Sequence, residues 1–126
     1  FQASLGMLKF YAYTGCSTCR NARKWLEATG IAFEEKAIRE TPPSKKELEA
    51  VLKALGGDLK RLFNTSGQDY RSLGMKNRLP TMTSKEAIDL LAGNGNLIKR
   101  PFLIDAKSGC GLTGFKEDEW TAFFAK

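Results

Sequence analysis

The sequence predicts an α/β fold in a single domain, with a mixed four-stranded sheet that carries helices on both faces. Up to Ile38 an apolar run, a helical pattern and a second apolar run follow one another, which is the order of a parallel β-α-β unit with a right-handed crossover. From Leu97 onward the pattern is that of a β-hairpin and a helix. Helical patterns fill the region between them, so we expect a helical insert over 42–96.

The opening unit begins with a strand pattern over 8–13, which a turn at 14–15 ends. From about Ser17 the apolar residues recur at helical spacing, and Gly30 is a helix C-terminal signal. The stretch 31–38 then predicts the second strand.

Two capping boxes mark helix starts in the insert. Ser44 stands three residues before Glu47, and Thr83 three residues before Glu86, each ahead of an apolar helical pattern. The reciprocal hydrogen bonds of such a pair satisfy backbone N–H groups at a helix start, so two amphipathic helices are expected. Their apolar faces are predicted to be Leu48, Val51, Leu52 and Leu55 in the first, and Ala87, Leu90 and Leu91 in the second.

The rest of the chain is predicted with less regular elements. A short helix is expected around 58–63, and the polar stretch 64–79 predicts only short helical pieces. A strand over 97–105 that a proline interrupts, a turn, and a returning strand over 110–115 form the hairpin. The closing helix spans 116–124. Its apolar side is predicted to be Trp120, Phe123 and Phe124.

Length and composition indicate one compact domain. The chain has 126 residues, of which 42% are hydrophobic and 27% charged, as in ordinary soluble globular proteins. No apolar stretch approaches the roughly 20 residues of a membrane helix, and no secretory signal is visible. We interpret residues 1–6 as a remnant ahead of a natural start at Met7, and 7–126 as the domain, which we expect to be monomeric.

The net charge of +6 suits anionic substrates or acidic partners. For any single basic group a solvated surface is the favoured explanation, and a binding role is the alternative. No basic stripe with interleaved aromatic residues is present, so direct nucleic-acid binding is not expected. The local basic groups are Arg20, Arg23 and Lys24; Lys45 and Lys46; Lys60 and Arg61; and Lys99 and Arg100.

The chain has three cysteines and no histidine. An odd cysteine count without a signal peptide favours a reducing cytoplasm over a secreted disulfide scaffold. The lack of histidine excludes Cys–His catalysis and mixed Cys/His zinc sites. Structural zinc takes four ligands, and Cys110 is the only thiol beyond the pair at 16 and 19, so no metal is expected.

The pair Cys16 and Cys19 lies where the first strand turns into the first helix. Unpaired N–H groups and the positive end of the helix dipole stabilise a thiolate there, which favours Cys16 as a nucleophile over a small buried apolar residue. Cys19 is either the resolving thiol or a core-facing residue in the helix stripe, and the two roles are compatible. Cys110 is most simply a strand residue near a turn, with a third redox role as the alternative.

Arg100 and Pro101 precede the third strand. Pro101 removes a ladder donor, and an X-Pro bond can adopt the cis form. Arg100 could hold an oxyanion through two parallel hydrogen bonds, or it could be a surface arginine beside an edge proline.

Four segments of the chain carry a specific order and spacing. They are Phe10-Tyr11-Ala12-Tyr13-Thr14-Gly15-Cys16-Ser17-Thr18-Cys19-Arg20-Asn21-Ala22, Tyr70-Arg71-Ser72-Leu73-Gly74, Leu97-Ile98-Lys99-Arg100-Pro101-Phe102 and Thr113-Gly114-Phe115. Taken together, these segments resemble the arsenate reductase/Spx/MgsR family of thioredoxin-like proteins, from Met7 to nearly the end of the chain.

The resemblance implies a thioredoxin-like core with a helical insert. It implies Cys16 as the redox cysteine, the one that attacks arsenate in the reductases, with Arg100 facing it and Pro101 beside the active site. Glutathione with glutaredoxin, or thioredoxin, is then the expected external reductant, and no bound cofactor is expected. The supporting residues of the active-site loop are expected to be Thr14, Gly15 and Ser17.

The chain also departs from the reductases. They use three arginines around the oxyanion, whereas Asn64 stands at one of the other two positions and no arginine lies near Thr113 at the other. A CxxC pair is closer to Spx and MgsR, in which it is a redox switch and the protein binds the C-terminal domain of the RNA polymerase α subunit. We therefore expect an arsenate-reductase-like thiol-disulfide redox protein, with a redox-switched transcriptional regulator as the alternative.

Overall fold

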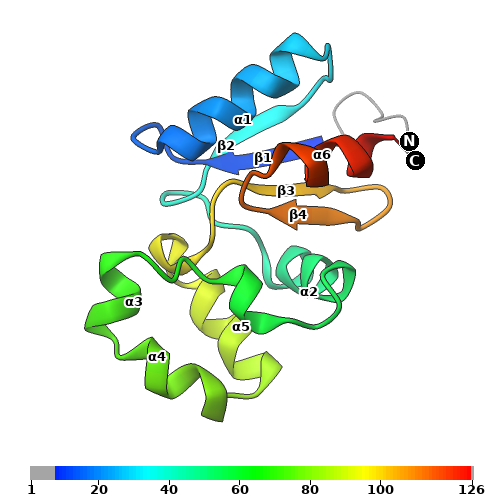
Figure 1. Cartoon of the computed structure of the whole chain (residues 1–126). Coiled ribbons are helices and arrows are strands. Elements are labelled where there is room, and N and C mark those ends of the chain that lie inside the picture. The colour runs from blue at the N-terminus through cyan, green and yellow to red at the C-terminus, as the bar shows by residue number, and fades with distance from the viewer. Residues whose placement is uncertain (1–7, 126) are drawn as a thin grey trace.

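The sheet is four-stranded and mixed, as the sequence predicts, and its strand order is β2-β1-β3-β4. The computed structural model describes residues 8–125 (Figure 1); the predicted remnant at 1–6 and the expected start at Met7 lie outside this range. Strand β1 (Leu8–Ala12) pairs in parallel with β2 (Glu34–Ala37) and antiparallel with β3 (Phe102–Asp105). Strand β4 (Gly111–Thr113) completes the hairpin with β3.

All four strands are shorter than the sequence patterns indicate, and β2 and β3 differ most. Strand β2 covers four residues and omits 31–33, although Ile31 and Phe33 still pack against the core. Strand β3 begins only after Pro101, because proline has no N–H to donate to a ladder. Ile98, predicted as part of that strand, forms instead an isolated antiparallel bridge with Phe63 of the insert.

Helices α1 (Ser17–Ala28) and α6 (Glu117–Phe124) pack on one face of the sheet, as Figure 1 shows. Trp120 of α6 is fully buried there, and its indole N–H donates to the Gly114 carbonyl at 3.0 Å. This hydrogen bond fixes α6 to the turn that follows β4. The buried side chains of this core are Leu8, Phe10, Ala12, Cys19, Ala22, Leu26, Leu103 and Trp120.

The insert packs on the other face of the sheet and contributes the second core. Both predicted capping boxes are formed, Ser44 with Glu47 and Thr83 with Glu86. Short helical pieces occupy the polar stretch, as expected. The elements of the insert are α2 (Lys45–Ala54), η1 (Leu59–Leu62), α3 (Gln68–Ser72), α4 (Met75–Arg78), η2 (Leu79–Thr81), α5 (Ser84–Ala92) and η3 (Gly95–Leu97).

The buried face of α5 differs from the predicted one. Ile88 is buried together with Ala87 and Leu91, whereas Leu90 is only partly buried. In α2 the predicted residues are buried except Leu55, the C-cap, which is partly exposed. Sequence spacing defines an apolar stripe, but the neighbouring helix decides which edge of the stripe is covered.

Helix α2 is joined to β1 by one partly buried carboxylate. Glu47 accepts hydrogen bonds from the Lys9 ammonium at 3.1 Å and the Tyr11 hydroxyl at 2.8 Å, in addition to its capping bond from the Ser44 N–H at 3.0 Å. Burial by itself would raise the pKa of Glu47, but these three donors and the lysine charge outweigh it and lower the pKa. Lys9 and Tyr11 lie two apart on a strand and so share one face of the sheet.

A second close approach joins the insert to the end of β2. A Cβ atom on Gly95 would overlap the carbonyl oxygen of Ile38 and lie 2.9 Å from the Cα of Arg39. Only glycine lets η3 lie this close to the segment that leaves β2. No helix among residues 8–125 is long and apolar enough to cross a membrane.

Candidate functional site

The Cys16 sulfur lies at the positive end of helix α1. Cys16 is the N-cap residue, and its Sγ accepts a hydrogen bond from the Cys19 backbone N–H at 3.3 Å. Its own N–H donates to the Tyr13 carbonyl at 3.1 Å, which closes the turn that ends β1. The side chain is half-buried and the sulfur is a free thiol. A sulfur anion here would be stabilised by the helix N–H groups that point at it.

Cys19 occupies a different environment one turn into the same helix. It is fully buried in the stripe with Ala22 and Leu26. Burial raises the pKa of the Cys19 thiol to about 12, and the neighbouring Cys16 adds to the rise, while a backbone hydrogen bond at Tyr13 and the Arg100 charge oppose it. Cys19 is therefore a neutral thiol at pH 7, so the two thiols of the pair stand in unlike surroundings.

Arg100 and Cys16 line the same cleft, although 84 positions separate them in the printed sequence. The Arg100–Pro101 peptide bond is cis. The cleft has a volume of about 680 Å³ and lies where the insert meets the sheet. Arg20, a member of the first basic group named in the sequence, is exposed and does not line this cleft.

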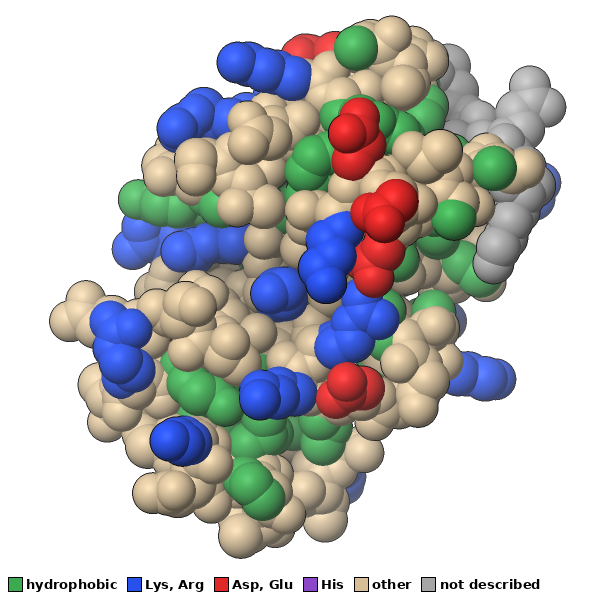
Figure 2. Space-filling view, in the orientation of Figure 1, with side chains coloured by type: hydrophobic (Ala, Val, Ile, Leu, Met, Phe, Trp, Pro, Cys, Tyr) green, Lys and Arg blue, Asp and Glu red, His purple; other side chains and the backbone are tan. Residues whose placement is uncertain are grey.

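Two of the four basic groups named in the sequence meet at this cleft. Lys60 and Arg61 come from η1, and Lys99 and Arg100 from the segment before β3; Lys116, the N-cap of α6, joins them. Figure 2 shows Lys and Arg side chains gathered along the hollow between the upper and lower parts of the molecule. The carboxylates of Asp58 and Glu119 also line the cleft, so its wall is mixed in charge but mainly cationic.

The far wall of the cleft offers neutral hydrogen-bonding groups. Asn64, the position of an arginine in the reductases that the chain resembles, lies here with the loop Thr65–Ser66–Gly67. Thr113, near the other such position, also lines the cleft, and its hydroxyl donates to the Arg61 carbonyl at 2.6 Å. Two arginines line the cleft: Arg61 pairs with Glu119 at 3.3 Å, whereas no carboxylate among residues 8–125 forms an ion pair with Arg100.

The expected supporting residues surround Cys16 in the loop. Thr14, Gly15 and Ser17 are exposed, and Ser17 begins α1. A Cβ atom on Gly15 would lie 2.7 Å from the Tyr13 ring, so the ring covers the backbone next to Cys16.

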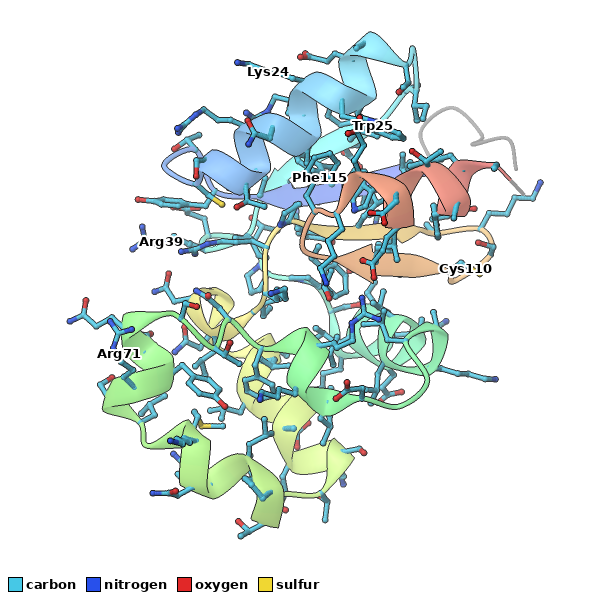
Figure 3. All side chains as sticks on the ribbon, viewed as in Figure 1. Lys24, Trp25, Arg39, Arg71, Cys110 and Phe115 are labelled. Atoms are coloured by element: carbon cyan, nitrogen blue, oxygen red, sulfur yellow. The ribbon has the colours of Figure 1, made fainter. Side chains whose placement is uncertain are left out.

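Sequence reasoning missed the environment of the Tyr13 ring. The guanidinium carbon of Arg100 lies 5.0 Å from the ring centroid, and that of Arg39 lies 4.7 Å from it. In Figure 3 Arg39 lies at the same end of the sheet as the start of α1, whereas Cys110 lies at the opposite end. Arg39 carries no motif signal, because a single arginine after a strand is ordinary in sequence. Cys110 is exposed in the loop before β4.

The described residues include no group of three or more Cys, Asp or Glu side chains placed to hold a metal ion. The arrangement they do provide is a thiol at a helix N-terminus, a second thiol beneath it, and cations around an adjoining cleft. Such a site can carry thiol-disulfide exchange on a small molecule that bears negative charge.

A thioredoxin-like sheet with a helical insert and a CxxC pair at the start of α1 defines a class of thiol-redox folds. The sequence model of the ArsC family matches residues 11–123, and the chain belongs to this family.

Curated relatives cover most of the chain. It is 49% identical over 113 residues to YusI of Bacillus subtilis, spanning 90% of this chain and 94% of YusI. It is 31% identical to the regulatory protein MgsR of Bacillus subtilis, over 79% of this chain and 78% of MgsR. It is also 31% identical to the global transcriptional regulator Spx of Enterococcus faecalis, over 95% of this chain and 88% of Spx.

Solved structures of the family share the fold closely. An ArsC family related protein from Bacteroides fragilis superposes with a TM-score of 0.87 at 39% identity, covering 94% of this chain and 98% of that one. A structure described as a possible arsenate reductase from Streptococcus mutans gives a TM-score of 0.83 at 38% identity, with 92% and 98% covered.

Proposed function

We propose that this protein is a thiol-disulfide oxidoreductase in which Cys16 is the nucleophile and Cys19 the resolving thiol. The single observation that carries the proposal is the position of the Cys16 sulfur, which caps α1 and opens onto the cationic cleft while Cys19 lies one turn beneath it. The Cys16 sulfur accepts a hydrogen bond from an N–H group in the first turn of α1, and burial raises the pKa of Cys19, which keeps that thiol protonated before the resolving step.

The proposed reaction transfers two electrons to the substrate. With a disulfide substrate, the Cys16 thiolate attacks one sulfur, and the other leaves as a thiolate. Cys19 then loses its proton and attacks the Cys16 sulfur, which releases the second thiol and leaves a Cys16–Cys19 disulfide. With arsenate, Cys16 displaces one oxygen as water, and the attack of Cys19 on Cys16 releases arsenite. In both cases Arg100 would neutralise negative charge on the substrate.

An external dithiol or a pair of small thiols must then reduce the Cys16–Cys19 disulfide. Glutathione with glutaredoxin, or thioredoxin, supplies such thiols. The half-buried Cys16 sulfur is the one that an incoming thiolate can reach, since Cys19 is fully buried. Arsenate is supported as a substrate by membership of the ArsC family and by the Streptococcus mutans relative.

The proposal is tested by NADPH-coupled turnover with arsenate, glutathione, glutaredoxin and glutathione reductase, with the rate of a reaction that lacks this protein subtracted. The wild type is compared with Cys16→Ser and, as a control for an exposed thiol, with Cys110→Ser. We expect Cys16→Ser to abolish turnover and Cys110→Ser to preserve it. Undiminished turnover in Cys16→Ser would rule the mechanism out.

A redox-switched regulator is the second candidate, and the likeness to MgsR and Spx over most of the chain favours it. In that role the Cys16–Cys19 disulfide would alter the surface at the start of α1, and the C-terminal domain of the RNA polymerase α subunit would bind one redox form. Binding of that purified domain to oxidised and to reduced protein, measured by calorimetry, tests this. If the domain binds both redox forms equally, or binds neither, and the protein shows turnover in the enzyme assay, the regulator role is rejected and the enzyme role remains.

A further inference from the structure

We infer that Arg39 and Arg100, held on the ring of Tyr13, form an anion-binding pair beside Cys16 that receives a carboxylate or oxyanion group of the molecule that reacts there. The inference rests on the proposed function for the role of Cys16, and it adds a residue, Arg39, and the chemical class of the ligand. The two arginines come from different parts of the chain, one after β2 and the other before β3.

The ring of Tyr13 brings the two guanidinium groups together. Their Cζ atoms lie 4.7 Å and 5.0 Å from the same ring centroid, within the range of cation–π contact. The ring covers Gly15, and the Tyr13 carbonyl accepts the Cys16 N–H at 3.1 Å. Both cations are therefore anchored on the residue that also shapes the turn holding the reactive sulfur.

Neither arginine is neutralised by the protein. Within residues 8–125, no carboxylate forms an ion pair with Arg39 or with Arg100, and the ring is the contact that both share. By contrast, Arg61 of the same cleft pairs with Glu119, and Arg23 pairs with Glu35 at 2.7 Å. Two guanidinium groups on one ring repel each other, and an anion bound at both would remove that repulsion.

The backbone holds Arg39 near this position. The Gly95 backbone of η3 lies against Ile38 and Arg39 so closely that no Cβ atom fits between them. Arg100 is held by Pro101, which is buried, and by the strand that follows. The two side chains thus extend from fixed backbone, and each presents planar N–H donors suited to a pair of oxygens.

The test compares two alkylating reagents on Cys16, one anionic and one neutral. Iodoacetate carries a carboxylate and iodoacetamide does not, so the ratio of their rates reports an anion site and cancels changes in the thiolate fraction. The protein carries Cys110→Ser, and mass mapping follows Cys16. We expect Arg39→Gln to lower the iodoacetate rate about twofold to fivefold more than the iodoacetamide rate, the size expected for one exposed charge pair.

Matched variants separate this role from net charge and from packing. Arg78→Gln removes one exposed guanidinium in α4 and should leave the ratio unchanged. Tyr13→Phe keeps the ring and should also leave it unchanged, whereas Tyr13→Leu should lower it as Arg39→Gln does. An equal fall for both reagents in Arg39→Gln, or no fall at all, would overturn the inference.

Competition identifies which anion the pair prefers. Sulfate as an unreactive oxyanion and acetate as a carboxylate are titrated against iodoacetate alkylation of the wild type and of Arg39→Gln. Protection by sulfate that Arg39→Gln weakens points to an oxyanion substrate; protection by acetate points to a carboxylate-bearing thiol or disulfide. Absence of protection by both counts against the pair. Because alkylation needs no turnover, a failed reductase assay with an intact rate ratio would reject the proposed function and leave the anion pair standing.

Discussion

Cys16 and Cys19 are three residues apart, and yet one reaches solvent at the cleft and the other lies wholly within the core. The helix geometry produces this contrast, because the N-cap side chain folds back over the first turn while the residue one turn on joins the buried stripe. A nucleophile must be accessible to its substrate, whereas a resolving thiol is kept away from solvent. One turn of helix α1 places an accessible thiol and a buried thiol side by side.

The resolving step should depend steeply on pH. The Cys19 pKa of about 12 means that its thiolate fraction rises with pH throughout the accessible range. After Cys16 has formed a mixed disulfide with glutathione, release of glutathione should accelerate roughly tenfold per pH unit between pH 6 and pH 9, because the thiolate is the attacking form. Quenched-flow mass spectrometry of the mixed disulfide measures the rate.

The same experiment on Cys19→Ser supplies the control. That variant should retain the glutathione adduct on Cys16 at every pH, since no second thiol is in place. A pH-independent release rate in the wild type would show that Cys19 is not the group that resolves the adduct.

Glu47 should contribute stability that depends on pH. Its folded-state pKa is below the ordinary value of 4.5, so the carboxylate stabilises the fold above that pH and the contribution is lost as the pH falls through the folded pKa. We expect Glu47→Gln to reduce the free energy of unfolding by about 1–3 kcal/mol at pH 7, because Lys9 and Tyr11 lose a charged partner.

Urea unfolding at pH 7 and at pH 3 tests this. The difference between wild type and Glu47→Gln should shrink at pH 3, because the contribution of the carboxylate declines as the pH falls below the ordinary value of 4.5 toward the lowered folded-state pKa. The control is Glu49→Gln, an exposed position on the same helix, which should change stability by less than about 0.5 kcal/mol at either pH. An equal loss for Glu47→Gln at both pH values would contradict the linkage.

The chemistry-bearing residues could be predicted one at a time, but their neighbours could not. Residue type and local pattern pointed to Cys16 and Cys19, whereas the expectation that Arg100 faces Cys16 came from the family resemblance; the roles of all three stay predictions. The contact of Arg39 with Tyr13 follows from how the segment leaving β2 passes the turn after β1, which no local pattern encodes. Of the basic residues named in the sequence, Arg100 lines the cleft with Cys16, whereas Arg20, one helical turn from Cys16 in sequence, does not.

At the scale of elements, helices and strands were predicted with unequal success. The helix starts at Ser44 and Thr83 are set by hydrogen bonds within three residues, so the pattern located both. Strand ends depend on partners elsewhere in the chain. Strand β2 is limited to the residues that face β1, and Pro101 delays the start of β3.

The docking of the insert against the sheet should depend on Gly95. A side chain there would overlap the Ile38 backbone, so we expect Gly95→Ala to lower the free energy of unfolding by about 2–4 kcal/mol. Gly93→Ala is the matched control, because its Cβ would lie 3.8 Å from its nearest neighbours and its φ of −93° suits alanine. Chemical denaturation measures both. Equal stability of the two variants would show that η3 can move away without cost.

At the scale of the whole molecule, one sheet serves two cores. Successive residues of β1 and β3 alternate between them, so that Phe10 and Leu103 face α1 and α6 while Tyr11 and Phe102 face the insert. Loss of the sheet would expose both cores at once. The two faces should therefore unfold together.

Two probes of urea unfolding check this coupling. Trp25 and Trp120 both pack in the core under α1 and α6, whereas the far-ultraviolet circular dichroism signal also includes the helices of the insert. Tryptophan fluorescence and circular dichroism should give the same midpoint. A circular dichroism change that precedes the fluorescence change would show that the insert unfolds by itself.

The two hydrogen-bonded contacts that Arg61 makes across the cleft have a further consequence. The Arg61 carbonyl accepts a hydrogen bond from the Thr113 hydroxyl of β4, and the Arg61 guanidinium forms an ion pair with Glu119 of α6. These contacts connect the insert to the C-terminal hairpin and helix at the cleft. Such a cleft has a preset width. Molecules would be selected for entry by size, and a bulky oxidised protein would have to present its disulfide on a projecting loop to reach Cys16.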